Sequence, residues 1–123
     1  MKKVRSVIIG CGSIAGEKDS LADKYLRSHA KAYAKNKYTE LVGVCDIDLK
    51  KAKKFAKKWN LKHYDNSIYN IINKSNPNLV SICTPASTHR EIILLLAKLK
   101  IRKIWLEKPA AKSVKDLNEI IKI

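Results

Sequence analysis

The chain has 123 residues and a mass of 13.9 kDa, which is the length of one domain. Hydrophobic residues make up 46% of it and charged residues 30%, a balance that excludes an intrinsically disordered chain. Every apolar run is too short to span a bilayer, and the run near the N-terminus is too short for a signal peptide. We therefore expect a cytoplasmic protein, and the formal net charge of +15 raises nucleic acid as a partner to be weighed.

Strand-like and helix-like segments alternate along the whole chain. Short apolar or β-branched runs bounded by turn-forming residues predict strands over Val4–Ile9, Glu40–Cys45, Leu61–Tyr64, Leu79–Cys83 and Lys103–Leu106. Apolar residues at helical spacing predict helices over Tyr25–Asn36, Asp48–Trp59, Ser67–Lys74, Ser87–Leu99 and Ser113–Lys122. This alternation predicts an α/β fold, a doubly wound parallel sheet of strand order 3-2-1-4-5 with helices on both faces.

Residues at the helix starts predict where the helices are capped. Asp48 and Ser113 are expected to cap the helices that follow them, and Ser87 or Thr88 is expected to cap the fourth helix. Leu26, His29, Ala30 and Tyr33 are expected on one apolar stripe of the first predicted helix.

The first predicted strand is followed by the motif G-x-G-x-x-A at Gly10–Ala15. The first glycine permits a tight turn, the second lets the backbone approach a pyrophosphate, and the small last residue lets helix and strand pack closely. The amides after the second glycine are expected to open a helix and to face the anion. The sequence therefore predicts a Rossmann dinucleotide-binding domain over residues 1–123, with contacts from Gly10, Cys11, Gly12, Ser13 and Ile14.

Asp46 ends the second predicted strand, where a carboxylate can accept both ribose hydroxyls of an adenosine. It lies 34 residues after Gly12 rather than the usual ~20, and the polar loop Glu17–Asp23 accounts for the excess. A carboxylate repels a 2′-phosphate, so we predict NAD rather than NADP. Lys50 and Lys51 lie nearby and keep NADP as the alternative, and a simple strand-ending turn residue is the other interpretation of Asp46.

Three further motifs follow in order. They are H-x-x-A-Y at His29–Tyr33, T-P-x-x-x-H at Thr84–His89 and E-K-P at Glu107–Pro109. With the glycine motif and Asp46, they make the chain resemble the N-terminal domain of the glucose–fructose oxidoreductase, inositol dehydrogenase and rhizopine catabolism family (Gfo/Idh/MocA). The resemblance covers essentially the whole chain, and E-K-P after a fifth strand is its most specific element.

This resemblance implies an oxidoreductase that transfers a hydride between a nicotinamide cofactor and a sugar, polyol or nucleotide-sugar. It implies that Thr84, Pro85 and His89 line the cofactor cleft and that Glu107 lies near the nicotinamide ribose. It also implies that Lys108 contacts the cofactor and meets the substrate oxygen as the catalytic residue. A lysine suits that position because it can remove the hydroxyl proton or polarise the oxygen.

The chain departs from the family in three places. Ala86 stands where many members have an asparagine, and the segment Glu17–Arg27 is long for the first crossover. The family's C-terminal substrate domain, which carries an aspartate and a histidine of the catalytic set, is absent. We therefore expect a truncated chain that binds dinucleotide without turnover. A homodimer is expected through the exposed edge of the fifth strand or through the helix Ser113–Lys122.

The cysteines and the lysines suggest two other functions. Cys11, Cys45 and Cys83 are an odd number without a C-x-x-C pair, and all three are expected near the cleft. A metal site there is disfavoured because cysteine is a common buried residue, so no metal is predicted. Nucleic acid is favoured by the charge and by the lysine-rich segment 50–58. It is disfavoured because lysines outnumber arginines 22 to 4 and no nucleic-acid motif is present.

A catalytically inactive dinucleotide-binding module is the third alternative. The retained Lys108 argues against it for the parent protein.

Overall fold

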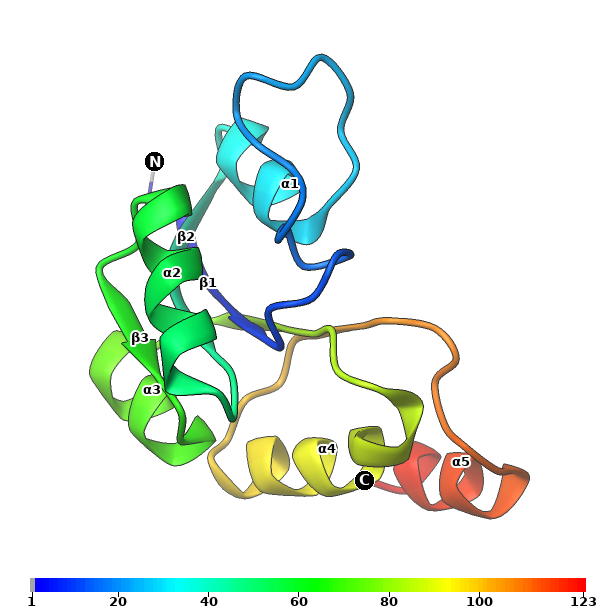
Figure 1. Cartoon of the computed structure of the whole chain (residues 1–123). Helices are drawn as coiled ribbons and strands as arrows, with labels where there is room; N and C mark the ends of the chain where they lie inside the picture. Colours follow the sequence, from blue (N-terminus) through cyan, green and yellow to red (C-terminus); the bar gives the residue numbers. More distant parts are fainter. Residues whose placement is uncertain (1) are drawn as a thin grey trace.

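Five parallel strands form a single sheet in the computed structural model, which describes residues 2–123. The strands are β1 (Val4–Ile9), β2 (Thr39–Cys45), β3 (His63–Asp65), β4 (Leu79–Ile82) and β5 (Ile104–Leu106). Their order is β3-β2-β1-β4-β5, as predicted (Figure 1). The third strand begins two residues later than predicted, because its pairing with β2 starts only where His63 lies opposite Gly43.

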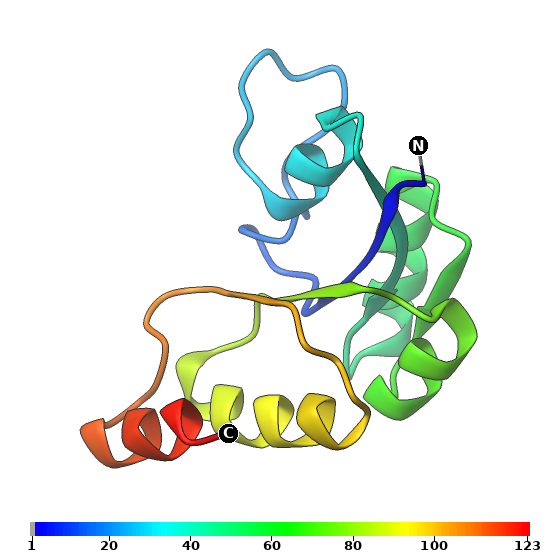
Figure 2. The same ribbon diagram turned by 180° about the vertical axis from the view of Figure 1, so that it is seen from behind.

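Helices cover both faces of this sheet, as predicted. They are α1 (His29–Lys35), α2 (Leu49–Trp59), α3 (Ile68–Ser75), α4 (His89–Lys98) and α5 (Val114–Ile121). One apolar cluster joins α1 and α2 to the sheet, and a second joins α3 and α4 to its other face. Figures 1 and 2 show α5 beside α4, on the opposite side of the sheet from α1. The result is a doubly wound fold with two separate core layers.

Two of the predicted helix caps are confirmed by side-chain hydrogen bonds, whereas Thr88 occupies the N-cap position of α4 without making one. Asp48 accepts the amides that open α2, and Ser113 accepts the amide of Asp116 at 3.1 Å. Before α4, however, a 3₁₀ turn η1 (Ala86–Thr88) intervenes. The Thr88 hydroxyl donates to the carbonyl of Pro85 at 2.7 Å instead of accepting a helix amide, so α4 begins without a side-chain cap.

The first crossover differs most from the prediction. The amides of residues 15–17 all donate to the carbonyl of Gly12 at 3.1–3.2 Å, which makes a closed turn and not the start of a helix. Gly16 follows with φ +145°, outside the helical range, and ends that turn. The helix α1 begins only after Ser28, whose hydroxyl accepts the amide of Lys31. Leu26 therefore lies outside the helix and is 61% exposed, not buried as predicted.

The segment between this turn and α1 is folded around a buried ion pair. Lys31 and Asp19 are each 2% exposed, and their charged atoms lie 3.8 Å apart. The Lys31 ammonium also donates to the carbonyls of Asp23 and Tyr25, and Asp19 accepts the Ser28 hydroxyl at 2.7 Å. The loop rises beyond α1 in Figures 1 and 2, and this network gives it a definite shape.

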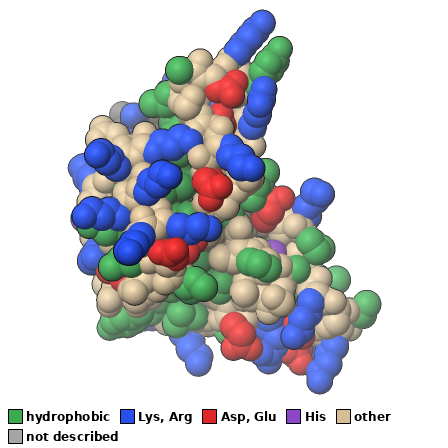
Figure 3. All heavy atoms as spheres, in the orientation of Figure 1, with side chains coloured by type: hydrophobic (Ala, Val, Ile, Leu, Met, Phe, Trp, Pro, Cys, Tyr) green, Lys and Arg blue, Asp and Glu red, His purple; other side chains and the backbone are tan. Residues whose placement is uncertain are grey.

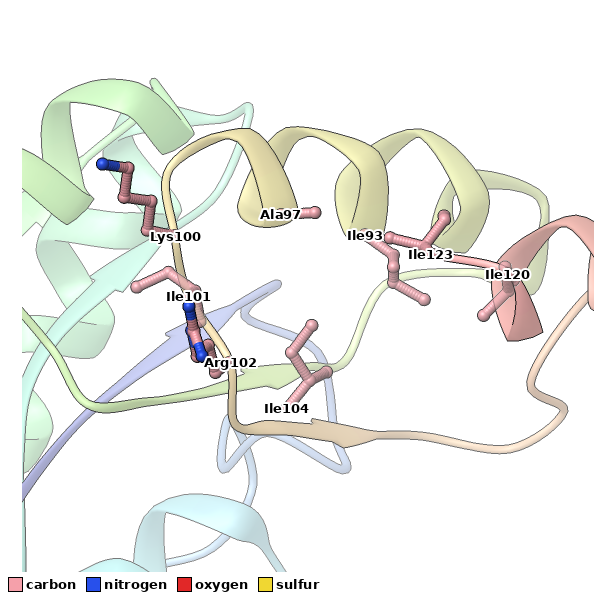
Figure 4. A pocket seen from close by; sticks show the side chains of 8 residues that line it. All are labelled: Ile93, Ala97, Lys100, Ile101, Arg102, Ile104, Ile120 and Ile123. Atoms are coloured by element: carbon pink, nitrogen blue, oxygen red, sulfur yellow. The ribbon is translucent and has the colours of Figure 1, made fainter.

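Two surface features bear on the alternatives raised by the sequence. The lysines of α2 are exposed while Ala52, Phe55 and Trp59 face the core, and Figure 3 shows Lys and Arg side chains gathered over this helix. A groove of about 430 Å³ lies between α4, β5 and α5, and Figure 4 shows isoleucines from all three elements around it. None of the helices in residues 2–123 has the length and apolar character needed to cross a membrane.

Candidate functional site

The glycine turn closes tightly against β4. Gly10 has φ +98°, and a Cβ added there would lie 3.0 Å from the carbonyl carbon of Cys83 and from Cγ2 of Thr84. Its amide donates to the carbonyl of Cys45 at 2.7 Å. Only glycine suits this position, because a side chain would meet both strained backbone and occupied space. The turn therefore brings the carboxyl ends of β1, β2 and β4 together.

The surroundings of Gly12 are open, whereas those of Gly10 are crowded. A Cβ added there would meet no atom within 4 Å, so the turn opens onto free space at this residue. Within residues 2–123, the amides of Gly12, Ser13 and Ile14 have no hydrogen-bond acceptor. Three unpaired amides beside an open approach fit the phosphates of a dinucleotide. They do so from a turn and not from a helix N-terminus, which differs from the prediction.

Asp46 lies directly beside this turn. One carboxylate oxygen accepts the amide of Cys11 and the other accepts the amide of Asp48, both at 2.9 Å. A carboxylate offers about four acceptor positions, so two remain for ribose hydroxyls. Cys11 differs from its neighbours in the turn, since its amide is already paired and the residue is 2% exposed. A hollow of about 140 Å³ lined by Cys11, Lys51 and Phe55 lies between the turn and α2.

The T-P segment forms the next wall of the site. The Thr84 and Thr88 hydroxyls are hydrogen-bonded at 2.6 Å, and Pro85 is exposed. His89 is fully buried, with Nε2 2.8 Å from the carbonyl of Thr84 and Nδ1 3.1 Å from the carbonyl of Ala110. Its ring therefore joins the T-P segment to the chain that follows the E-K-P motif, and it lies in the interior beneath the expected cleft.

The E-K-P motif follows β5 immediately. The Glu107 amide donates to the carbonyl of Ile82 at 3.0 Å, which holds the motif beside the end of β4. The Glu107 side chain is 22% exposed, and its carboxylate lies 2.9 Å from Nε2 of His29. The hydrogen bond from His29 lowers the pKa of Glu107, and the charge of Lys108 adds to this effect although burial opposes it. Lys108 is exposed, and the peptide bond joining it to Pro109 is cis.

Sequence reasoning missed the interior partners of this site. His29 is predicted on the apolar stripe of the first helix and is indeed buried, but its contact with Glu107, 78 residues further along the chain, is not predicted. Ser81 is also fully buried and contacts His29. A serine in the middle of an apolar strand was the available signal, because a buried hydroxyl requires a partner.

The three cysteines lie near the ends of their strands, and none forms a disulfide. Burial raises the pKa of all three thiols, to about 12 for Cys45 and Cys83. We predict that a disulfide reagent at pH 8 modifies the native chain slowly and modifies three thiols rapidly after unfolding in guanidinium. Rapid modification of one thiol in the native chain would contradict this. The absence of a metal stays a prediction.

A family model described as an oxidoreductase family with an NAD-binding Rossmann fold (GFO_IDH_MocA) matches residues 4–123. The chain belongs to this family. Among curated proteins, it is 29% identical over 117 residues to D-glucoside 3-dehydrogenase of Escherichia coli strain K12. That match covers 95% of this chain and 30% of the relative.

Two solved structures of similar fold carry a bound dinucleotide. One is an oxidoreductase from Agrobacterium radiobacter in complex with NAD+, L-tartaric acid and magnesium, with a TM-score of 0.81 and 21% identity. The other is the WlbA dehydrogenase from Chromobacterium violaceum in complex with NADH and UDP-GlcNAcA, with a TM-score of 0.83 and 24% identity. The matches cover 98% and 99% of this chain and 32% of each of those chains. At these sequence identities, the two structures establish the Rossmann fold alone. This member of the Gfo/Idh/MocA family spans about a third of the length of each relative.

Proposed function

We propose that this chain is the cofactor-binding part of an oxidoreductase that uses NAD in preference to NADP and acts on a sugar, polyol or nucleotide-sugar. The proposal rests on one observation: the turn that carries the three unpaired amides of Gly12, Ser13 and Ile14 also contacts the carboxylate of Asp46, through the amide of Cys11. The amides suit a diphosphate and the carboxylate suits an adenosine ribose. Relatives that act on glucosides or bind a nucleotide-sugar support the substrate class.

Each residue of the site would have a role that follows from its position. Thr84 and Pro85 would border the nicotinamide half, and Glu107 would accept a hydroxyl of its ribose. When bound, the nicotinamide would supply the hydride acceptor or donor. Lys108 would act at the substrate oxygen through its Nζ, either by accepting the hydroxyl proton as a neutral amine or by donating a hydrogen bond to that oxygen. His89, being buried, would hold Thr84 in place without touching the ligand.

The proposal includes the expectation that these 123 residues bind dinucleotide in the cytoplasm without turnover. Hydride transfer requires the substrate carbon to be held against the nicotinamide, and Lys108 is the one residue of this chain to which we assign a contact with substrate. The relatives are about three times as long as this chain. An inactive dinucleotide-binding module is the second candidate, and a longer version of the protein that reduces no sugar-like substrate would favour it.

The preference for NAD rests on the charges around Asp46. A 2′-phosphate at this ribose would meet the carboxylate. Lys51, one of the two lysines that favour NADP, already contacts Glu17, and so does Lys58. Lys51 lies 4.0 Å from the Glu17 carboxylate, and the Lys58 ammonium donates to the Glu17 carbonyl at 2.5 Å.

Replacing Asp46 tests the proposed function. Asp46→Ala is expected to weaken NADH binding ~10-fold or more, since hydrogen bonds to a charged group contribute ~1.5–3 kcal/mol. NADPH affinity should stay constant or rise, because a repelling charge is removed. Calorimetric titration with NADH and with NADPH measures the ratio of the two affinities. Disruption of the turn alone would weaken the binding of both dinucleotides equally. Asp48→Ala is the control. It should cost ~1 kcal/mol of stability and leave NADH affinity unchanged. Unchanged NADH affinity in Asp46→Ala would contradict the assignment.

Self-association is a further part of the proposal. The strand β5 lies at the edge of the sheet, and Val114 and Ile121 of α5 are 73% and 72% exposed. A second copy of the chain would cover this apolar surface. Light scattering at increasing concentration is expected to show a dimer, and Val114→Lys is expected to weaken it if α5 is the contact. A monomer at every concentration would contradict self-association.

A further inference from the structure

A chain of polar side chains runs through the interior from Tyr33 to Glu107. The Tyr33 hydroxyl lies 2.5 Å from the Ser81 hydroxyl, and Ser81 lies 2.9 Å from Nδ1 of His29. The other ring nitrogen of His29 lies 2.9 Å from the carboxylate of Glu107. Tyr33, Ser81 and His29 are 3%, 0% and 2% exposed, whereas the Glu107 side chain is 22% exposed. This series of hydrogen-bonded side chains therefore leads from the core to the surface of the proposed cofactor site.

Donor and acceptor can be assigned in each hydrogen bond of this series. An ionised carboxylate only accepts, so Nε2 of His29 donates to Glu107. In a neutral imidazole, Nδ1 then accepts from the Ser81 hydroxyl, which in turn accepts from Tyr33. Every member then has a partner of the correct kind, which is the arrangement that buried polar groups require. The opposite tautomer would set the lone pair of Nε2 against a carboxylate oxygen.

Aromatic packing fixes the plane of the His29 ring. Trp105 of β5 stacks on it with 3.7 Å between ring centroids and 27° between planes. Tyr33 meets Trp105 edge to face at 5.7 Å. A histidine so held cannot turn away from Glu107 without losing the stack, so α1 and β5 jointly determine where the carboxylate lies.

We propose that His29 is a positioning residue for Glu107. It donates to the carboxylate through Nε2, its Nδ1 accepts from Ser81, and the carboxylate is thereby fixed towards the nicotinamide ribose. This inference rests on the proposed function for the contact with the ribose. The positioning of the carboxylate itself can be measured without any cofactor. Its test therefore has two parts that fail separately.

Nuclear magnetic resonance of the free chain tests the positioning. The nitrogen shifts of His29 should identify the Nε2–H tautomer, because the Glu107 carboxylate can only accept a hydrogen bond. The carboxyl carbon of Glu107 should titrate at a higher pH in His29→Leu than in the wild type, because a hydrogen bond to the ionised form is lost. Lys108 and Cys83 also face Glu107, and both remain in this variant. An Nδ1–H tautomer, or an unchanged titration of Glu107, would overturn the proposal.

Two variants of His29 then test the effect on binding. The side-chain amide of Gln can still donate to Glu107, whereas Leu has a similar volume and no donor. His29→Leu is expected to weaken NADH binding ~10-fold and His29→Gln less than ~3-fold, with circular dichroism confirming that both fold. Equal losses in both variants would overturn the positioning role. A wild-type chain that binds no NADH would contradict the proposed function, and the magnetic-resonance result would still decide the role of His29.

Discussion

Gly12→Val is expected to abolish measurable NADH binding, with at least a ~100-fold loss of affinity, while the fold stays intact. A Cβ at Gly12 meets no atom within 4 Å, so the side chain enters open space in the free protein. That space is the approach to the unpaired amides of residues 12–14, and a diphosphate kept away from them loses several charged hydrogen bonds, at ~1.5–3 kcal/mol each. Calorimetric titration with NADH measures the loss, and thermal unfolding checks the fold.

Gly10→Ala is the comparison variant, because a Cβ two residues earlier is expected to affect the fold and not the approach to the amides. Its Cβ would lie 3.0 Å from Cys83 and Thr84 at a φ of +98°. We expect it to lower the free energy of unfolding by ~2–4 kcal/mol through overpacking and backbone strain. If Gly12→Val bound NADH as tightly as the wild type, the amides of this turn would not be the phosphate site.

Lys31→Met is expected to destabilise the chain by ~3–5 kcal/mol, because it leaves Asp19 buried without its counter-charge. Burial opposes the ionisation of Asp19, but hydrogen bonds from Ser28 and from backbone amides outweigh it and lower its pKa. A lowered pKa means that this stabilisation is complete above the ordinary pKa of an aspartate. It is lost as the pH falls towards the lower value of the folded state.

Urea unfolding at pH 7 and at acidic pH measures both effects. Lys35→Met on the same helix is the control, since Lys35 is exposed and should change stability by less than ~0.5 kcal/mol. The difference between wild type and Lys31→Met should shrink at acidic pH, where a protonated Asp19 no longer needs the ammonium. Equal effects of Lys31→Met and Lys35→Met would contradict a buried ion pair.

The strands and their order were predictable because both depend on local pattern. Period and turn residues mark each strand, and the rules of parallel sheets then fix the order β3-β2-β1-β4-β5. The caps at Asp48 and Ser113 were predictable for the same reason, since a cap bonds amides two or three residues away.

The interior polar contacts could not be predicted from local pattern. Lys31 reads as a solvated residue of a helix, and only the fold of residues 17–27 around it provides three oxygen partners. The partner of His29 lies 78 residues away. The missing helix after the glycine turn depends on the φ of +145° at Gly16, which a glycine permits but does not require.

Titration of the purified chain with NADH, followed by nicotinamide fluorescence, tests the central claim most directly. We expect saturable binding of one NADH per chain, and no saturation with Gly12→Val under the same conditions. Binding should persist at 0.5 M salt, because one diphosphate replaces few counterions, whereas retention on DNA would fall steeply. No saturable binding of NADH, together with salt-sensitive retention on DNA, would contradict the dinucleotide site and favour nucleic acid as the partner.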